Sequence, residues 1–409
     1  MDKNAVKVKD DYVPSEQILK KYADVLVKFA LGGGKGVKKG EVVFIQIHEC
    51  SKPMLIPLRR AVLECGAHPI LQYIPDDVSR DFYEKASDEQ ITFFPSKLLK
   101  GRIDEINHSI YIIAETNKHE LEGIDPKRLM LGQKSFKPYM EWRDKKENAG
   151  KFTWTLAMYG THQMAKEAKM SLKEYWAQII KACYLDDKNP IKTWKKVYSD
   201  IDRIIRKLDS MKIQKVRVEA KGTDITIGIG EKRAWKGGSG RNVPTFEIFT
   251  SPNCNDVNGK IQFTEPLYIY GNLIKDVYLE FKDGIVTKSS ASVGEKVLKE
   301  MIATKNANMI GEFSMTDGRM SKITKFMGET LFDENVGGPQ GNTHLALGKA
   351  YKDCYQGDPS KVSEKEWKRL GYNDSSVHTD IVATSRRKVT AILPDGSKKV
   401  IYDDGKFLI

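Results

Sequence analysis

Two histidines near the C-terminus stand beside side chains that could share metal chemistry with them. His378 and Asp380 are two residues apart in VHTDIV, and on a strand, where side chains alternate, both would project from the same face. His344 lies seven residues before Tyr351, and two helical turns would bring these side chains to one face if the segment HLALGKAY is a helix. The region 331–380 is therefore the first candidate for a functional site.

Two glutamates further upstream have surroundings that suit a metal ligand. Glu247 follows a Gly/Pro loop and starts an apolar run that predicts a strand, which is a rigid mount, and Glu312 follows apolar residues in MIGEFSM. Histidines mixed with carboxylates suit a divalent ion such as Zn, Co or Mn. Three carboxylates and two histidines exceed the need of one catalytic zinc. The set favours two ions, about 3.5–4 Å apart, that share a bridging carboxylate.

Several other polar residues are interpreted as structural. Glu334, in the DEN turn before His344, is interpreted as a helix cap or a salt-bridge partner. His48 and His119 are each followed by Glu, but neither opens the HExxH zinc motif, so both are expected in loops or at the surface. His162 is likewise interpreted as a loop residue.

The pattern before residue 211 predicts an α/β fold. The β-branched run 41–48, the helical pattern 54–67 and the apolar run 69–75 predict a strand, a helix and a strand, with Gly66 suited to the helix end. This order predicts parallel strands and a right-handed crossover. Residues 109–115 predict another buried strand.

Helical periodicity is strongest at 189–211, where one apolar stripe runs along the segment and charges fill the other face. Shorter helices are predicted at 15–29 and after Ser171, which forms a capping box with Glu174. Beyond residue 211 the period changes to two, with many short strands between Gly and Asn/Asp turns. We therefore expect an α/β N-terminal domain, 1–211, followed by an α+β, mostly β, metal-binding catalytic domain, 212–409.

Composition narrows the class of protein. The hydrophobic fraction of 40% and the charged fraction of 30% are those of a globular protein, and the sequence has no signal-peptide run or membrane-spanning apolar stretch. The lack of both predicts a cytoplasmic location. The five cysteines are scattered without CxxC spacing, which indicates reduced thiols. The net charge of +12 is spread along the chain, which favours a solvated surface over nucleic-acid binding.

The sequence resembles a known family along nearly its whole length. The motifs include VKKGEVVFI, ECGAHPI, AKEAKMSLKEYW, TDITIGIG, NVPTFEIFTSP, IGEF, LFDEN with THLALGKAY, and VHTDIV. They resemble the thermophilic-aminopeptidase family of metallopeptidases, of the aminopeptidase T and aminopeptidase S type. The resemblance implies an α/β N-terminal domain and a homodimer that encloses the active sites. It also implies that two divalent ions are bound by Glu247, Glu312, His344, His378 and Asp380, with Tyr351 facing the same site.

The function that follows from this resemblance is a metal-dependent aminopeptidase that removes N-terminal residues from peptides by means of a metal-activated water. One of the glutamates would accept the proton of that water, and Glu312 is favoured as the bridging ligand close to it. Tyr351 would stabilise the tetrahedral oxyanion. The alternatives are another two-metal hydrolase, such as a phosphoesterase, and a non-catalytic relative that binds metal or peptide.

One residue departs from the pattern of the family. Phe246 stands where many members have glycine before the first glutamate. Its ring either narrows the pocket for the first side chain of the substrate or packs in the core. The segment THQMAKEAKMS, with His162 and Met164, also differs from many relatives, so no substrate preference is carried over.

Overall fold

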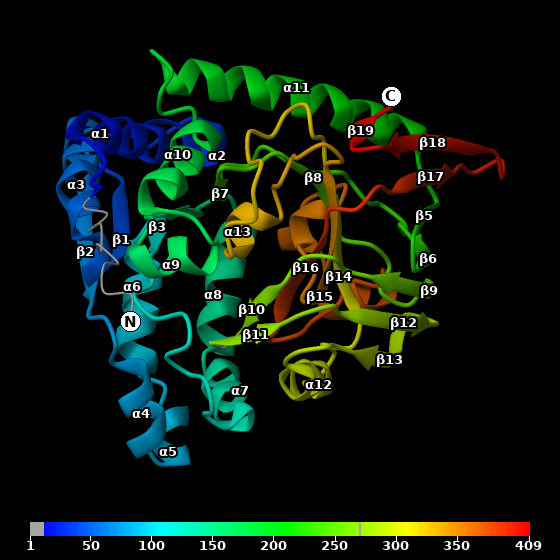
Figure 1. Cartoon of the computed structure of the whole chain (residues 1–409), viewed down its shortest axis with the longest axis horizontal. Coiled ribbons are helices and arrows are strands. Elements are labelled where there is room, and N and C mark those ends of the chain that lie inside the picture. Colours follow the sequence, from blue (N-terminus) through cyan, green and yellow to red (C-terminus); the bar gives the residue numbers. More distant parts are fainter. Residues whose placement is uncertain (1–11, 270) are drawn as a thin grey trace, which may run out of the picture.

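The computed structural model describes residues 12–269 and 271–409 of the chain. An α/β half and a mostly β half lie side by side, and helix α11 (Pro190–Met211) extends along both (Figure 1). The two kinds of architecture are those that the sequence predicts.

The α/β half is built on a parallel sheet of five strands in the order β2-β1-β3-β4-β7. The central strands form from uncharged β-branched and aliphatic runs, as in β1, where Val43, Ile45 and Ile47 are fully buried. The predicted strand-helix-strand unit is confirmed, with parallel strands. Gly66, just after its helix, has the expected positive φ of 69°. The strands are β1 Val42–His48, β2 His68–Ile74, β3 His108–Ile113, β4 Thr153–Met158 and β7 Asn242–Val243.

Helices cover both faces of this sheet. Alternate residues of β1 point to opposite sides: Val43 and Ile45 pack in the cluster that contains α1 and α3, whereas Phe44 packs with α6 and α8. This arrangement is a doubly wound layer structure. The helices of this half are α1 Glu16–Val25, α2 Leu31–Gly34, α3 Leu55–Glu64, α4 Ser79–Lys85, α5 Asp88–Thr92, α6 Ser96–Glu105, α7 Pro126–Ser135, α8 Lys137–Asn148, α9 His162–Glu167 and α10 Leu172–Ala182.

Helix α11 matches the strongest helical pattern of the sequence. Its first turn is capped by the Asn189 side chain, which accepts a hydrogen bond from the backbone N–H of Lys192. The predicted apolar stripe is buried along the helix at Trp194, Tyr198, Ile201, Ile204 and Leu208. The helix ends at Met211, and the first strand of the β half begins four residues later, at Lys215.

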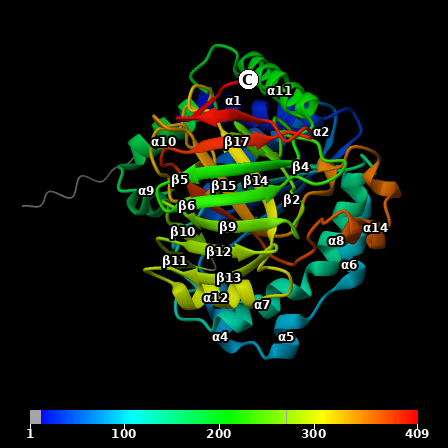
Figure 2. The same cartoon turned by 90° about the vertical axis from the view of Figure 1, so that its right-hand side faces the viewer.

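Two antiparallel sheets form most of the second half. The larger sheet has the order β13-β12-β9-β6-β5-β17-β18-β19 and is seen face-on in Figure 2. The smaller sheet has the order β16-β15-β14-β8, and apolar residues of both sheets share one core cluster. The strands are β5 Lys215–Ala220, β6 Thr223–Gly228, β8 Glu247–Thr250, β9 Val257–Gln262, β10 Leu267–Ile269, β11 Asn272–Ile274, β12 Tyr278–Lys282, β13 Ile285–Ser290, β14 Ile310–Thr316, β15 Asn342–Gly348, β16 His378–Ala383, β17 Lys388–Ile392, β18 Lys398–Asp403 and β19 Lys406–Phe407. The helices are α12 Glu295–Ala303, α13 Thr330–Asp333 and α14 Glu364–Arg369.

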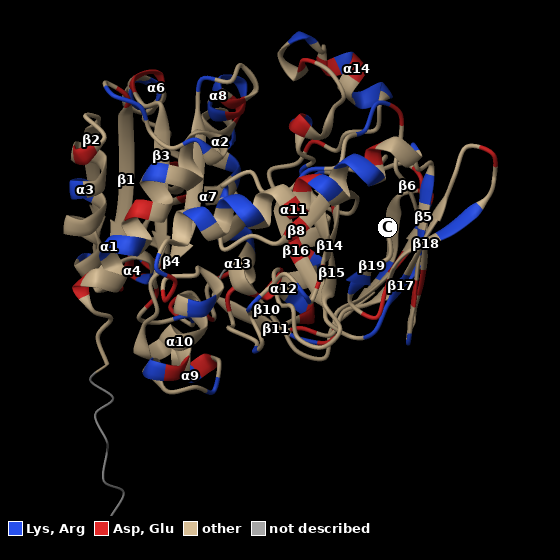
Figure 3. Ribbon diagram, turned by 90° about the horizontal axis from the view of Figure 1, so that it is seen from above, with Lys and Arg blue, Asp and Glu red and all other residues tan. Residues whose placement is uncertain are grey.

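The chain crosses between the two halves more than once. After the predicted boundary at residue 211, the short strand β7 returns to pair with β4 of the parallel sheet. The division of the chain into 1–211 and 212–409 therefore stays a prediction. Lysines, arginines and acidic residues are intermixed over both halves, as the sequence suggests (Figure 3). Within the described residues, none of the helices combines the length and apolar character needed to cross a bilayer.

Candidate metal centre

The four-stranded sheet brings the predicted ligands together through its register. Glu312 of β14 and Asp380 of β16 both lie opposite Ala346 of the central strand β15. His344 is two residues before Ala346 on the same strand, so its side chain projects from the same face. The methyl group of Ala346 leaves room above the sheet for the three longer side chains.

Glu312 owes its position to an irregularity in β14. The register of β14 against β15 shifts between Ile310 and Glu312, which is a bulge at Gly311. A Cβ atom built on Gly311 would lie 2.3 Å from the backbone oxygen of Lys349, so only glycine fits there. The bulge aims the Glu312 carboxylate into the cluster.

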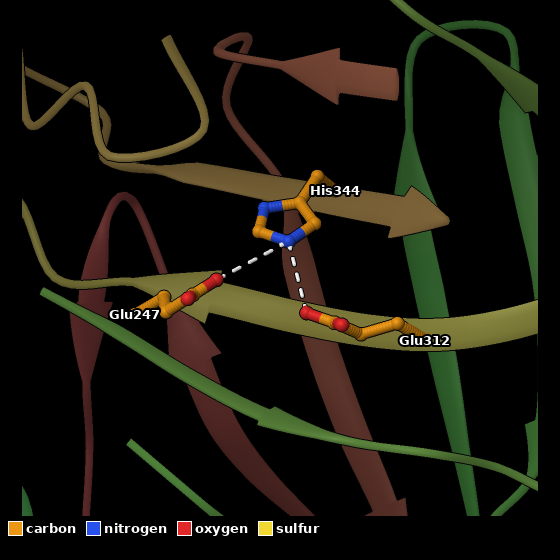
Figure 4. A group of neighbouring side chains, drawn as sticks. All are labelled: Glu247, Glu312 and His344. Atoms are coloured by element: carbon orange, nitrogen blue, oxygen red, sulfur yellow. Dashed lines mark hydrogen bonds and ion pairs between the residues drawn. The ribbon is translucent and has the colours of Figure 1, made fainter. Parts of the chain in front are cut away.

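His344 is the centre of the cluster. Its Nε2 atom lies 3.2 Å from Glu312 Oε1 and 3.4 Å from Glu247 Oε2, as Figure 4 shows. Asp380 Oδ1 is 3.8 Å from the same nitrogen. Glu247 is the first residue of β8, as the sequence predicts, and β8 lies on the side of β14 opposite β15. Its carboxylate therefore reaches the cluster from that side. Three strands thus deliver carboxylate oxygens to one imidazole nitrogen.

His378 forms the second half of the cluster. Its Nδ1–H donates a 2.7 Å hydrogen bond to the backbone oxygen of Lys349, which leaves Nε2 as the atom turned towards the carboxylates. Nε2 lies 3.5 Å from Asp380 Oδ1 and 3.7 Å from Glu312 Oε2. The prediction that His378 and Asp380 share a strand face is confirmed. Glu312 faces the two histidines with different oxygens, Oε1 towards His344 and Oε2 towards His378, whereas Asp380 faces both with Oδ1.

The segment after His344 differs from its expected form. HLALG is not helical but belongs to strand β15, whose residues are buried without alternation because it is an inner strand covered on both faces. Tyr351 follows the strand and reaches the site by a turn rather than along a helix. Its ring centroid lies 4.8 Å from that of His378. Burial, and then the charges of Glu312 and Asp380, raise the pKa of Tyr351 well above its usual range, so its phenol keeps its proton.

Glu334 lies in the cluster, which its interpretation as a cap or salt-bridge partner did not anticipate. It is buried, accepts a 2.8 Å hydrogen bond from Asn242 Nδ2, and can share an ion with His344 and Asp380. Burial, and then the charge of Glu247, raise its pKa well above the usual range. The sequence carries one signal for this: the stretch 331–344 has no lysine or arginine that would pair with Glu334.

The electrostatics of the cluster favour a bound cation. Among the described residues, no lysine or arginine forms an ion pair with its four carboxylates. Burial, reinforced by the charge of Glu312, raises the pKa of Glu247 to about 8. Burial alone would lower the pKa of His344, but its hydrogen bond to Glu312 and the nearby carboxylates raise it to about 9. Protons on these groups stand in for positive charge.

The donor set fits divalent ions. Three groups each bring their ligand atoms within 4.8 Å of one another, and the first two share Glu312. Asp380 Oδ1 is buried and accepts no hydrogen bond, as expected of an oxygen reserved for a metal. The groups are Glu247 with Glu312 and His344, Glu312 with His378 and Asp380, and Glu334 with His344 and Asp380.

Arg241 is a second residue that sequence reasoning missed. Its guanidinium lies 5.2 Å from the centre of the Tyr351 ring and forms ion pairs of 2.8 Å with Glu147 and 2.9 Å with Asp353. With Trp154 it lines the small pocket above the carboxylates. It joins helix α8 to the turn that carries Tyr351.

Phe246 does not narrow this pocket. Its side chain is fully buried and stacks on Trp194 of α11, with ring centroids 5.4 Å apart. Of the two interpretations of this residue, packing is therefore confirmed. Met164 is also fully buried, and His162 is exposed at the start of α9.

Comparisons with known proteins identify a family and a fold for the chain. The profile of a family described as thermophilic metalloprotease (M29) matches residues 15–407. Aminopeptidase PepS of Streptococcus thermophilus is 28% identical over 96% of this chain and 98% of its own length. Aminopeptidase T of Thermus aquaticus is 28% identical over 71% of this chain and 74% of its own length. The solved structure of AmpT from Thermus thermophilus has the same fold, with a TM-score of 0.82 at 22% identity over 96% of this chain and 100% of that one.

Proposed function

The chain belongs to the thermophilic metalloprotease family, whose members hydrolyse peptide bonds, and from this premise we propose that it is a metal-dependent aminopeptidase with two divalent ions in its site. The resemblance drawn from the sequence motifs is thereby confirmed at the level of the family. Release of the N-terminal residue is supported by the relatives, which carry the name aminopeptidase and align with nearly the whole chain.

The observation that carries the proposal is the cluster of four carboxylates and two histidines, four of them buried and two half-buried, without a lysine or arginine partner in the described part of the chain. We assign Glu247, Glu312, His344, His378 and Asp380 as ligands and add Glu334 to the set. The two oxygens of Glu312 face different histidines, Oε1 towards His344 and Oε2 towards His378, which supports its role as the bridging ligand. The mixed donor set suits Zn, Co or Mn.

The chemistry divides between the ions and the side chains of this chain. Bound divalent ions lower the pKa of a water and polarise the scissile carbonyl. One of the glutamates of the cluster accepts the proton of the attacking water and then passes it to the leaving amine. The protonated phenol of Tyr351 donates a hydrogen bond to the tetrahedral oxyanion. The bond from His378 to the Lys349 carbonyl keeps the imidazole in the orientation that ligation requires.

A homodimer and a cytoplasmic location complete the proposal. The edge strand β2 is uncharged and exposes Ile70, Leu71 and Tyr73 by 40–43% each, which is unusual for an edge that faces solvent. All five cysteines are free thiols, as suits a reducing compartment. Light scattering of the wild type and of Leu71→Glu tests the dimer: the variant should shift towards the monomer, and a monomeric wild type would refute the proposal.

The activity is tested with a peptide in two forms, one with a free N-terminus and one N-acetylated. We expect release of the first residue from the free peptide alone, and loss of this release after chelation. Cleavage of both forms would indicate an endopeptidase. Cleavage of bis-p-nitrophenyl phosphate without any cleavage of unblocked peptides would favour the phosphoesterase alternative and refute the aminopeptidase.

A further inference from the structure

A large cleft ends beside the candidate metal centre. It has a volume of about 1270 Å³ and lies between helices of the α/β half and residues 349–378 of the β half. His378 lines this cleft and also the small pocket that contains Glu247, Glu312 and Asp380. A peptide whose first bond lies at the cluster therefore has one large space open to its remaining residues.

Helix α8 forms one wall of the cleft along its whole length. Six of its residues line the cleft at helical spacing, so they lie on one face. Its 12 residues span about 18 Å. The C-terminal end is close to the metal centre, because Glu147 pairs with Arg241, which lies over Tyr351. The N-terminal end, after Phe136, is the far end. The six lining residues are Lys137, Met140, Glu141, Asp144, Lys145 and Asn148.

The charges within the cleft largely neutralise one another. Lys137 of α8 lies 3.1 Å from Asp374 across the cleft, and Lys349 pairs with Asp144. Lys352 lies 3.0 Å from Glu364. Because these charges pair, the cleft has little net electrostatic potential with which to select a charged peptide.

The far end of the cleft is apolar. Phe82, Phe93 and Phe136 line it with exposed fractions of 47%, 70% and 46%. Aromatic rings that line a cleft and stay this accessible are the kind of surface that binds apolar side chains. They lie where α4, α5 and the start of α8 meet, away from the end of α8 that contacts Arg241.

We propose that this cleft binds the peptide downstream of the scissile bond in extended form, along α8, and that its aromatic end selects an apolar residue about five positions beyond the cleaved bond. An extended chain advances about 3.3 Å per residue, so about 18 Å of helix accommodates about five residues. A peptide of about six residues would thus fill the cleft. The inference rests on the proposed aminopeptidase function. The occupant is the substrate because His378 lines both the cleft and the pocket that contains the proposed ligands.

The test compares two hexapeptides, Leu-Ala-Ala-Ala-Ala-Phe and Leu-Ala-Ala-Ala-Ala-Asp, by the initial rate of leucine release. The wild type should cleave the Phe-ended peptide with a kcat/KM about tenfold higher, because burial of a phenylalanine side chain is worth at least this factor. Phe93→Asp should reduce this ratio to about threefold or less, and Phe136→Asp serves as a second variant at the same end. Leu98→Asp is the matched control, since Leu98 is 72% exposed on α6 but does not line the cleft. Its ratio should equal that of the wild type.

Each other outcome has a definite meaning. Equal cleavage of both hexapeptides by the wild type would overturn the inference but leave the aminopeptidase intact. Failure to release leucine from either peptide would refute the proposed function itself. A change in molar mass of Phe93→Asp by light scattering would assign the aromatic end to a subunit interface and overturn the inference.

Discussion

Replacing Glu247 by glutamine separates two properties of its carboxyl group, which is a ligand in the proposed site and a buried acid in the metal-free protein. Burial and the charge of Glu312 hold the pKa of Glu247 near 8 instead of 4.5. Between these two values the unfolded chain releases a proton that the folded, metal-free protein retains, so stability falls as pH rises. At pH 7, about 2.5 pH units above the ordinary pKa, the penalty is about 3 kcal/mol at 1.36 kcal/mol per unit.

Glutamine keeps the shape of the side chain and removes this penalty. In urea unfolding of metal-free protein, Glu247→Gln should be more stable than the wild type by up to about 3 kcal/mol at pH 7 and equal to it at pH 4.5. With excess metal, kcat/KM should fall at least about 100-fold, because substitution of residues that merely support ligands already costs 10–100-fold. Glu105→Gln, an exposed site at the end of α6, is the matched control and should change neither quantity.

The reasoning would be refuted by either of two results. A variant that is less stable than the wild type at pH 7 would show that the Glu247 carboxylate is stabilised, not strained, in the metal-free cluster. A variant with normal turnover at saturating metal would remove Glu247 from the ligand set.

Three further predictions concern the ligands and the core. Glu334→Gln should weaken metal affinity about 10–100-fold, as measured by isothermal titration calorimetry. Unchanged affinity would show that Glu334 is not a ligand and has only a structural role. Metal binding at pH 7 should release protons, because burial lowers the pKa of His344 and His378 but the nearby carboxylates outweigh burial and raise each pKa to about 9. The affinity for metal should therefore rise with pH up to about pH 9. Calorimetry in buffers of different ionisation enthalpy measures the released protons, and a release of none would contradict this prediction. Trp194→Ala should lower the free energy of unfolding, measured in urea, by about 3–5 kcal/mol, since Trp194 is 1% exposed and stacks on Phe246. A decrease of less than about 1 kcal/mol would contradict this packing.

The local pattern of the sequence predicts most single elements correctly. The stripe of α11, the strand-helix-strand unit around Gly66 and the alternation at His378 and Asp380 depend on nearest neighbours in the chain, and all are confirmed. A helix at HLALGKAY, the condition for His344 and Tyr351 to share one helical face, is wrong, and an inner strand that is buried on both faces loses the alternation that would identify it. The residues of HLALG do not indicate which other elements of the fold will cover the strand.

The parts of the site that the sequence did not reveal depend on distant contacts. The stretch 331–344 offers Glu334 no basic partner, but only the folded chain places its carboxylate beside His344 and Asp380. Arg241 acts through Glu147 and Asp353, 94 residues before and 112 residues after it in the chain. Such partners are set by tertiary packing and have no signature in local spacing.

The central claim is tested most directly by measuring metal content and activity together. The protein is stripped with a chelator and titrated with Zn, Co or Mn, while bound metal per chain and release of the N-terminal residue are recorded at each step. The account predicts an inactive stripped protein whose activity returns as two ions bind per chain, with Glu312→Gln remaining inactive at the same metal content. Full activity in the stripped protein would contradict the account, as would full activity in Glu312→Gln.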